Sequence, residues 1–200
     1  MRARAGTIAE FPAPPAPGSR LPSSPPPPPP SGVELSGRDP VEIVKEAIGE
    51  LAFLDDPRAA AGVCCGALVL GLGARAVVIH AHDARTRTAR VVAASGAGTD
   101  GLVGSSARVE DDLVASTVIG TCAPLTWSLV PGGLPRGAPV RLAQVGAARA
   151  VVAVPAIVRS RVVAIVEVVD AKESADPAVE AAARYAGSTL ADFLVARKQR

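Results

Sequence analysis

Two histidines lie in a pattern that metal binding could use. His80 and His82 are two positions apart in an apolar run that predicts a β-strand, and Asp83 follows directly. Because side chains alternate across a strand, both imidazole rings would leave the same face, and imidazole and carboxylate are both zinc ligands. These are the only histidines in the chain, however, and no further ligand follows at a site-like spacing. We therefore expect ordinary strand residues near a turn, and no metal site.

The three cysteines offer thiol chemistry. Cys64 and Cys65 fall in a predicted helix, where neighbours point about 100° apart and rarely join, and buried cysteine usually behaves as a small hydrophobic residue. Cys122 lies near predicted loops and is the better candidate for a reactive or ligand-contacting thiol, although no cationic neighbour in sequence favours its thiolate. Because one cysteine is left over and no C-x-x-C occurs, we expect no disulfide framework and a reducing, cytoplasmic compartment.

A glycine-rich segment, Gly96–Gly101, matches G-x-G-x-x-G and follows a predicted strand. A dinucleotide site also needs a helix that opens at the motif and an acidic residue about 20 positions later. Residues 102–107 continue the predicted loop and residues 116–122 contain no acid, so we expect a flexible loop. No Gly-x-Ser-x-Gly occurs, and no histidine lies in a motif that would activate a nucleophile. The sequence predicts no catalytic residue and a non-enzymatic protein.

Two single residues remain as candidates for a binding site. Glu167 interrupts the apolar run VVAIVEVV, and a buried, ionised carboxylate is costly unless it is paired. We expect a structural partner, such as an arginine on a packing helix, with pocket lining as the alternative. Trp127 is the sole tryptophan and lies on a weakly predicted strand, residues 125–130, between two loops. A pocket wall and a place in the core fit it equally well.

The remaining pattern predicts an α+β fold with a mostly antiparallel sheet. Asp-Pro pairs at residues 39–40, 56–57 and 176–177 combine an N-cap with proline at the first helical position. The expected elements, in order, are helices from 39 and from 56 to about 72, a hairpin over 76–94, a short helix over 108–120 with three acids in its first turn, a strand over 125–130, a short helix over 140–146, a hairpin over 150–169 and a last helix over 176–198. The second hairpin is continuously apolar, which indicates burial on both faces of the sheet.

Proline and charge divide the chain into two parts. Twelve of the 19 prolines lie in the first 40 residues, so we expect residues 1–38 to be a disordered, semi-stiff arm and residues 39–200 to be the folded domain. The arm has four arginines and two glutamates, which leaves 17 basic and 17 acidic residues of the 21 and 19 in the chain. Residues 39–200 therefore have no net charge, and the chain has only five aromatic residues on which bases could stack, so we expect no nucleic-acid binding. No apolar run predicts a membrane span.

Three segments resemble the GAF domain family of small-molecule-sensing and dimerising modules. They are LVLGLGARAVVIHAHDARTRTARVVAASG at 68–96, GAARAVVAVPAIVRSRVVAIVEVVDAKES at 146–174 and the last predicted helix, and the resemblance covers about residues 40–198. It implies a central antiparallel sheet with the N- and C-terminal helices packed on one face. It also implies a ligand cavity on the other face, so that Trp127, Cys122 and Glu167 become the candidate ligand-binding residues.

The special ligand sites of that family do not reappear in this sequence. Cyclic-nucleotide-binding members have Asn-Lys after the last central strand, then Phe and Asp-Glu, whereas residues 170–172 are DAK with neither following. Bilin-binding members have a cysteine beside a histidine, but Cys122 is followed by Ala-Pro. Members that reduce free methionine sulfoxide need several cysteines in loops around the pocket, and only Cys122 falls near one. The resemblance therefore leaves the ligand and any cofactor unknown.

We accordingly expect a regulatory GAF-like module that senses a small molecule, dimerises, or does both, and passes the signal to a partner protein. Extra apolar positions on and after the first helix, Ile43, Ala47 and Leu54, predict a homodimer interface. The alternative is a degenerate domain that has lost its ligand and only docks to other proteins, with the Pro-rich arm as the docking segment.

Overall fold

The computed structural model describes residues 39–49, 51, 54–128, 139–145, 148–171 and 177–198. The arm expected over residues 1–38 lies outside the described residues, as does most of the loop that follows the fourth strand. The described part forms one compact unit with an α+β architecture. Within it, no helix combines the length and the apolar character needed to cross a membrane.

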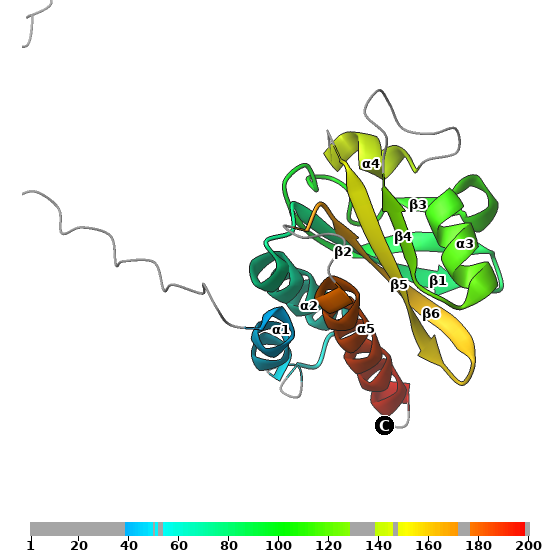
Figure 1. The fold of residues 1–200 in the computed structure, drawn as a ribbon. Coiled ribbons are helices and arrows are strands. Elements are labelled where there is room, and N and C mark those ends of the chain that lie inside the picture. Colours follow the sequence, from blue (N-terminus) through cyan, green and yellow to red (C-terminus); the bar gives the residue numbers. More distant parts are fainter. Residues whose placement is uncertain are drawn as a thin grey trace, which may run out of the picture. The chain divides into compact units, whose positions relative to one another are not determined.

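A six-stranded sheet forms the centre of the fold (Figure 1). Its order is β3-β2-β1-β6-β5-β4, and every neighbouring pair is antiparallel. The strands are β1 (Ala76–Asp83), β2 (Thr88–Gly96), β3 (Ser106–Arg108), β4 (Leu125–Ser128), β5 (Ala150–Val158) and β6 (Arg161–Val169). The β1–β2 and β5–β6 hairpins confirm the two hairpins expected from the sequence, and the β1–β6 ladder joins them.

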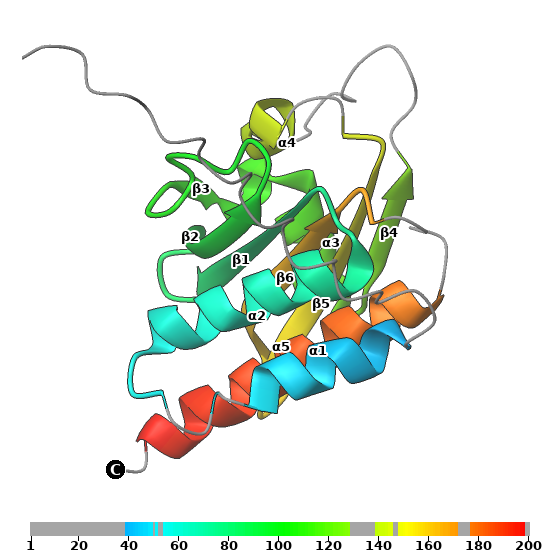
Figure 2. The ribbon, with the colours of Figure 1, turned by 90° about the vertical axis from the view of Figure 1, so that its left-hand side faces the viewer.

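Three helices cover one face of the sheet (Figure 2). They are α1 (Pro40–Ile48), α2 (Pro57–Leu72) and α5 (Pro177–Lys198). Asp39 and Asp56 cap the first two helices by accepting hydrogen bonds from the backbone N–H groups of Val41 and Arg58, at 2.9 and 3.0 Å. The N-cap and proline signals therefore predicted both helix starts correctly. The packing of the N- and C-terminal helices on one face agrees with what the resemblance to the GAF family implied.

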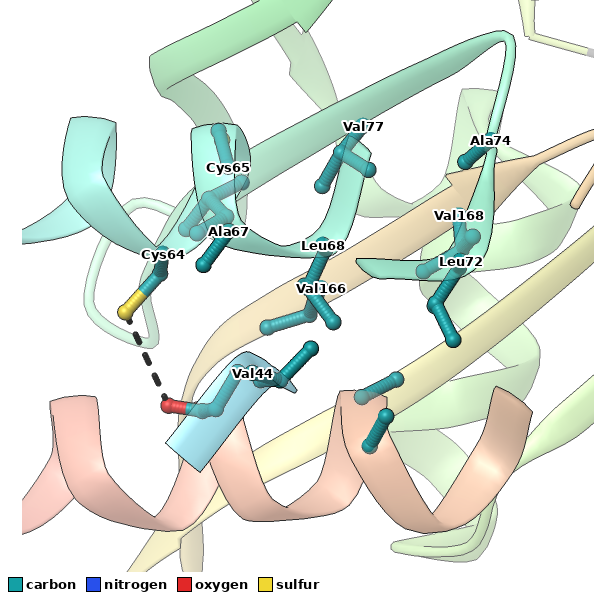
Figure 3. Packing of buried hydrophobic residues seen from close by; sticks show 14 of the residues in the cluster. Val44, Cys64, Cys65, Ala67, Leu68, Leu72, Ala74, Val77, Val166 and Val168 are labelled. Carbon is teal, nitrogen blue, oxygen red and sulfur yellow. Dashed lines mark hydrogen bonds between the residues drawn. The ribbon is translucent and has the colours of Figure 1, made fainter. Parts of the chain in front are cut away.

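The first hydrophobic core lies between these helices and the sheet (Figure 3). Val44, Leu68, Val77 and Val166 are among its fully buried members. Cys64 and Cys65 are unpaired and buried in the same core, which confirms the structural role expected for them. Burial raises the pKa of the Cys64 thiol to about 12 and raises that of Cys65 as well.

The opposite face of the sheet carries a second core beneath α3 (Leu113–Thr121) and α4 (Val140–Val145). Val151 and Val169 from the sheet pack there against Val118 and Leu142. Because alternate residues of β5 and β6 enter the two cores, the continuous apolarity of this hairpin does reflect burial on both faces.

The expected helix over residues 108–120 is wrong in its first part. Residues Ser106–Arg108 form the short edge strand β3, and Val109–Asp111 form a 3₁₀ turn, η2. The α-helix begins only at Leu113, because Asp112 accepts a hydrogen bond from the Ala115 N–H at 2.9 Å and acts as its N-cap. Of the three acids expected in the first helical turn, two therefore lie in the 3₁₀ turn and the third is the cap.

Candidate functional site

A cavity of about 290 Å³ lies on the face of the sheet away from α1, α2 and α5. His80 of β1 and Ala89 and Val91 of β2 line it from the sheet. Leu102 and Ser105 line it from the β2–β3 loop. Its other lining residues come from β3, the end of η2 and the region of α4, and they are Ser106, Ala107, Asp111, Asp112, Pro139, Arg141 and Gln144.

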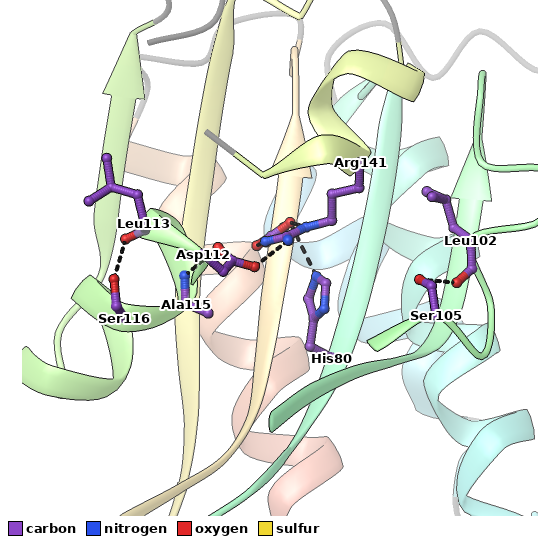
Figure 4. Close-up of polar contacts among 9 residues, drawn as sticks. His80, Leu102, Ser105, Asp112, Leu113, Ala115, Ser116 and Arg141 are labelled. Atoms are coloured by element: carbon purple, nitrogen blue, oxygen red, sulfur yellow. Dashed lines mark hydrogen bonds and ion pairs between the residues drawn. The ribbon is translucent and has the colours of Figure 1, made fainter. Parts of the chain in front are cut away.

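Arg141 connects three elements beneath this cavity (Figure 4). Its Nε donates to Glu167 Oε2 at 2.7 Å, and its NH2 group donates to Glu167 Oε1, so the guanidinium meets this carboxylate with two parallel hydrogen bonds. Its NH1 group donates to Asp112 Oδ2. The residues Arg141, Glu167 and Asp112 are 8%, 0% and 1% exposed, respectively. A single buried arginine thus joins α4 to β6 and to the start of α3.

The charge of Glu167 depends on this arrangement. Burial pushes the pKa of its carboxyl group up, but the positive charge of Arg141 and the His80 ring push it further down. The net effect is a pKa well below the usual range, so Glu167 is ionised. Its direct neighbours across the ladders are Val78 and Ala153, which offer the carboxylate no polar side chain. The sequence expectation that Glu167 has an arginine partner on a packing helix is therefore confirmed.

His80 approaches the same carboxylate from β1. Its Nε2 atom lies 3.2 Å from Glu167 Oε2, a distance at which a charged ring would form an ion pair. Nε2 is a buried side-chain atom that faces this carboxylate and has no other hydrogen-bond partner among the described residues (Figure 4). His80 is 2% exposed and lines the cavity. The cavity is thus lined by a histidine whose buried Nε2 atom faces the Glu167 carboxylate.

The short helix α4 is held in place from two further sides. Arg75 Nε donates to the Val145 carbonyl at 3.2 Å, which satisfies a free carbonyl at the end of the helix. Gly98, with φ of +72°, brings the β2–β3 loop against α4 so closely that a Cβ there would lie 2.7 Å from the Gln144 carbonyl oxygen. The β2–β3 loop and α4 both line the cavity, and they contact each other where Gly98 meets Gln144.

The other residues expected to bind a ligand lie elsewhere. Trp127 is half-buried on β4, where it packs against the second core. Cys122 is exposed and follows α3 with a left-handed backbone. Neither is among the described residues that line the cavity, and Glu167 acts from beneath it. His82 also points to this face of β1, and its Nδ1 contacts the Val162 carbonyl oxygen at 2.9 Å.

The residues expected at a dimer interface are all partly engaged within the chain. Ala47 and Leu54 pack against the first core. Ile43 is half-buried, and its side chain lies against Gly71 of α2, where an added Cβ would be 3.3 Å from it. Each therefore has only part of its surface available to a second molecule.

Sequence reasoning missed Asp112, Arg141 and His80 as members of one cluster. The signal that could have found Asp112 was an acid directly before the apolar run LVAS, which is typical of an N-cap. Arg141 is the only charged residue of α4, which also points to a buried partner. No local signal places His80 beside Glu167. Within the part of the chain that the structure describes, no group of three or more His, Cys, Asp or Glu side chains could hold a metal ion.

Comparison with known proteins identifies the fold. No family model matches the sequence, and no curated protein is significantly similar to it. The GAF domain of a phosphoenolpyruvate-protein phosphotransferase from Coxiella burnetii has a TM-score of 0.68 at 15% identity, over 80% of this chain and 95% of that chain. The corresponding domain from Acinetobacter has a TM-score of 0.62 at 13% identity, over 80% and 94%. A free methionine-R-sulfoxide reductase from Neisseria meningitidis, solved with its substrate, has a TM-score of 0.65 at 15% identity, over 80% and 90%. The chain therefore has a GAF-like fold, as the sequence resemblance predicted.

Proposed function

We propose that this domain is a non-enzymatic regulatory module that binds a small molecule in the cavity beside Arg141 and passes the signal to a partner protein. The observation that carries the proposal is a 290 Å³ cavity whose lining includes two buried charged side chains, Asp112 and Arg141. Mostly apolar cavities with a few convergent polar groups are typical of small-molecule sites. The GAF domains among the structural neighbours are consistent with a regulatory role.

The positions of the thiols support a role without catalysis. One structural neighbour is a methionine sulfoxide reductase, and such chemistry needs a thiol at the substrate. Here Cys64 and Cys65 are buried in the opposite core and Cys122 is exposed away from the cavity. No described lining residue is a cysteine.

The signal would travel through the sheet. Glu167 of β6 belongs to the cavity face, while its neighbours Val166 and Val168 pack into the core shared with the three helices. A ligand that prefers one conformation of the β2–β3 loop and α4 would raise the population of that conformation. Because Arg141 ties α4 to Glu167 of β6, a change at α4 would move β6, and β6 also packs against the helices on the other face. Those helices are where we place the partner protein or a second copy of the chain.

A test of ligand binding is native mass spectrometry of the full chain, purified gently from cells. We expect a species that carries additional mass in the range of a small molecule. The variant Ala107→Phe places a bulky side chain at the cavity wall from an exposed position and should release this mass. Ala123→Phe, also exposed but away from the cavity, is the matched control and should retain it. Loss in neither variant, or in both, would argue against binding at this cavity.

A second candidate, the ligand-free docking module, has one observation in its favour. Arg141, Glu167 and Asp112 pair with one another through hydrogen bonds and opposite charges, so the cluster needs no ligand.

Dimerisation through the face formed by α1, α2 and α5 is compatible with both candidates. Leu70 of α2 is a large apolar side chain that is nevertheless 73% exposed, as expected if another molecule covers it. Leu70→Glu should lower the mass in solution if a second copy covers this helix, whereas Val103→Glu, at an exposed loop position, should not. An unchanged mass in both variants would argue against a dimer through α2.

A further inference from the structure

Exposed arginines gather at one end of the sheet, in the turns and strand ends of the two hairpins and of β3. We call them the arginine row, and they are Arg85, Arg87, Arg108, Arg159 and Arg161. The ladders bring them to the same end, because the end of β3 pairs with the start of β2 and the start of β6 lies towards the end of β1. Residues 39–200 have no net charge as a whole, so the row is a local excess of positive charge.

Ion pairs within the described residues neutralise only part of this charge. Glu110 Oε2 lies 3.8 Å from Arg87, and its Oε1 lies 3.6 Å from Arg108, so two guanidinium groups share one carboxylate. The side chains of both arginines remain more than 70% exposed. Among the residues that the structure describes, no carboxylate forms an ion pair with Arg159 or Arg161. Most of the row therefore faces solvent.

Two further carboxylates in this region have other contacts. Asp83 accepts a hydrogen bond from the Arg85 backbone N–H at 2.8 Å and so holds the β1–β2 turn. Asp111, in η2, lines the cavity. The strands and turns that carry the five arginines and η2 thus contribute three carboxylates, which leaves an excess of two positive charges at this end of the sheet.

The backbone conformation of two arginines is costly. Arg87 and Arg159 have φ angles of +52° and +48°, in the left-handed region that favours glycine and asparagine. Either turn would be more stable with asparagine at that position, so stability does not explain the arginines. Strained residues are typical of sites that contact another molecule. Arginine at the left-handed position of both hairpins, at the same end of the sheet, therefore favours a role for the two guanidinium groups in binding.

The dimensions of the row limit what it can contact. It crosses the sheet in the order β3, β2, β1, β6, β5, which spans about 19 Å at a strand spacing of about 4.8 Å. An extended peptide of about six residues has the same length, because a strand rises by about 3.3 Å per residue. The row is thus long enough to contact several side chains of one extended segment.

The charges within the row indicate the kind of anion. Guanidinium groups bind carboxylates with paired hydrogen bonds. A continuous array of phosphates, on a nucleic acid or a lipid surface, would also approach Asp83, Glu110 and Asp111, whereas separate side chains of a protein segment can be placed between them. We propose that the arginine row docks an extended, carboxylate-rich segment of about six residues from a partner protein. This surface is separate from the cavity and from the face formed by α1, α2 and α5.

Two peptides of equal length test whether charge drives the docking. One is an acetylated, amidated hexapeptide in which glutamate and serine alternate, and the other has glutamine in place of each glutamate. Each would be titrated into the ¹⁵N-labelled full chain at about 0.15 M salt, with the backbone amides of Arg85, Arg108 and Arg161 as reporters. We expect saturable shifts with the acidic peptide and at least tenfold weaker binding of the neutral one. Tetrathymidylate, which also carries three negative charges, and vesicles of phosphatidylcholine and phosphatidylserine in equal parts probe the other occupants.

A double variant separates binding from folding. Arg87→Asn with Arg159→Asn removes two charges at positions where asparagine suits the backbone. Its affinity for the acidic peptide should fall about tenfold, whereas its urea midpoint should rise. Arg149→Gln with Arg184→Gln removes the same charge at exposed positions before β5 and on α5, away from the row, and should keep the affinity within about twofold.

Four results would overturn the inference. One is the absence of saturable shifts at the reporter amides, and another is an equal loss of affinity in the two double variants, which would mean that only the net charge matters. A third is tighter binding of tetrathymidylate or of the vesicles than of the acidic peptide, which would replace the protein segment with a phosphate surface. The fourth is a lower urea midpoint of Arg87→Asn with Arg159→Asn, which would mean that the arginines stabilise their turns.

Discussion

Replacing Arg141 with methionine should strongly destabilise the domain. Methionine has a similar length but cannot donate a hydrogen bond, so the variant loses two bonds to Glu167 and one to Asp112. The two carboxylates would stay at 0% and 1% exposure without their cation. Removal of one partner from a buried ion pair costs about 3–5 kcal/mol. We expect a loss in this range at neutral pH, measured as the free energy of unfolding in urea.

The pH dependence of the same variant has a definite sign. In the native protein the pKa of Glu167 is lowered, so its pairing stabilises the fold above the unfolded pKa of about 4.3 and this contribution is lost as the pH falls. Without Arg141, burial dominates and raises the pKa of Glu167 above the unfolded value. Protonation of Glu167 then raises the free energy of unfolding of the variant, because a neutral carboxyl group is less costly to bury. The stability difference between the two proteins should therefore shrink as the pH is lowered from 7 to 5.

Two further variants complete this experiment. Arg58→Met removes an exposed arginine from α2 and should change the stability by no more than about 0.5 kcal/mol. The triple variant Arg141→Met, Glu167→Met, Asp112→Asn removes all three charges but keeps the cap of α3, and it should recover most of the loss. A cost below about 1 kcal/mol for Arg141→Met, or a cost that grows towards pH 5, would refute the reasoning. A cost below about 1 kcal/mol would mean that the carboxylates are in contact with water.

Three other outcomes follow from local geometry. In the folded protein an alkylating reagent should modify the exposed Cys122 within minutes. Cys64 should react only after unfolding, because burial raises the pKa of its thiol to about 12. Mass spectrometry of the native and the denatured chain distinguishes the two thiols. Gly98→Ala should weaken binding of any cavity ligand and cost about 2 kcal/mol or more, because its Cβ would lie 2.7 Å from the Gln144 carbonyl oxygen at a φ of +72°; unaltered stability would show that the loop and α4 do not touch. Ser160→Gly should stabilise the chain by about 0.5–1 kcal/mol, because residue 160 has a φ of +61° in the two-residue turn between β5 and β6, where glycine is favoured; a lower urea midpoint would contradict this.

The parts of the fold that local chemistry determines could be predicted from the sequence. Asp-Pro pairs marked the starts of α1 and α2 because a carboxylate cap and a proline without an N–H both suit the first turn. The β5–β6 hairpin was predicted because two apolar runs flank a tight turn, expected over residues 159–161; the structure shortens this turn to two residues by pairing Val158 with Arg161. Glu167 was expected to pair with an arginine on a packing helix because a lone carboxylate in such a strand cannot stay ionised without a partner.

The parts that depend on distant segments could not be predicted in the same way. Strand β3 has only three residues and is defined by its ladder to β2 rather than by its own composition. Arg141 and Glu167 are 26 positions apart, and Asp112 is 29 positions before Arg141, so no spacing rule connects them. His80 resembles any strand residue near a turn until β6 is placed beside it. The cavity itself exists only because a loop and α4 meet over the sheet.

The alternation of side chains along β6 explains why a charge beneath the cavity can matter to helices that it does not touch. Glu167 and Ile165 point to the cavity face, whereas Val166 and Val168 pack against the core beneath α1, α2 and α5. A strand with both faces buried cannot shift one set of side chains without shifting the other, because protein interiors are close-packed. The ion pairs of Arg141 therefore couple the position of α4 to that of β6, and through β6 to the packing against the three helices.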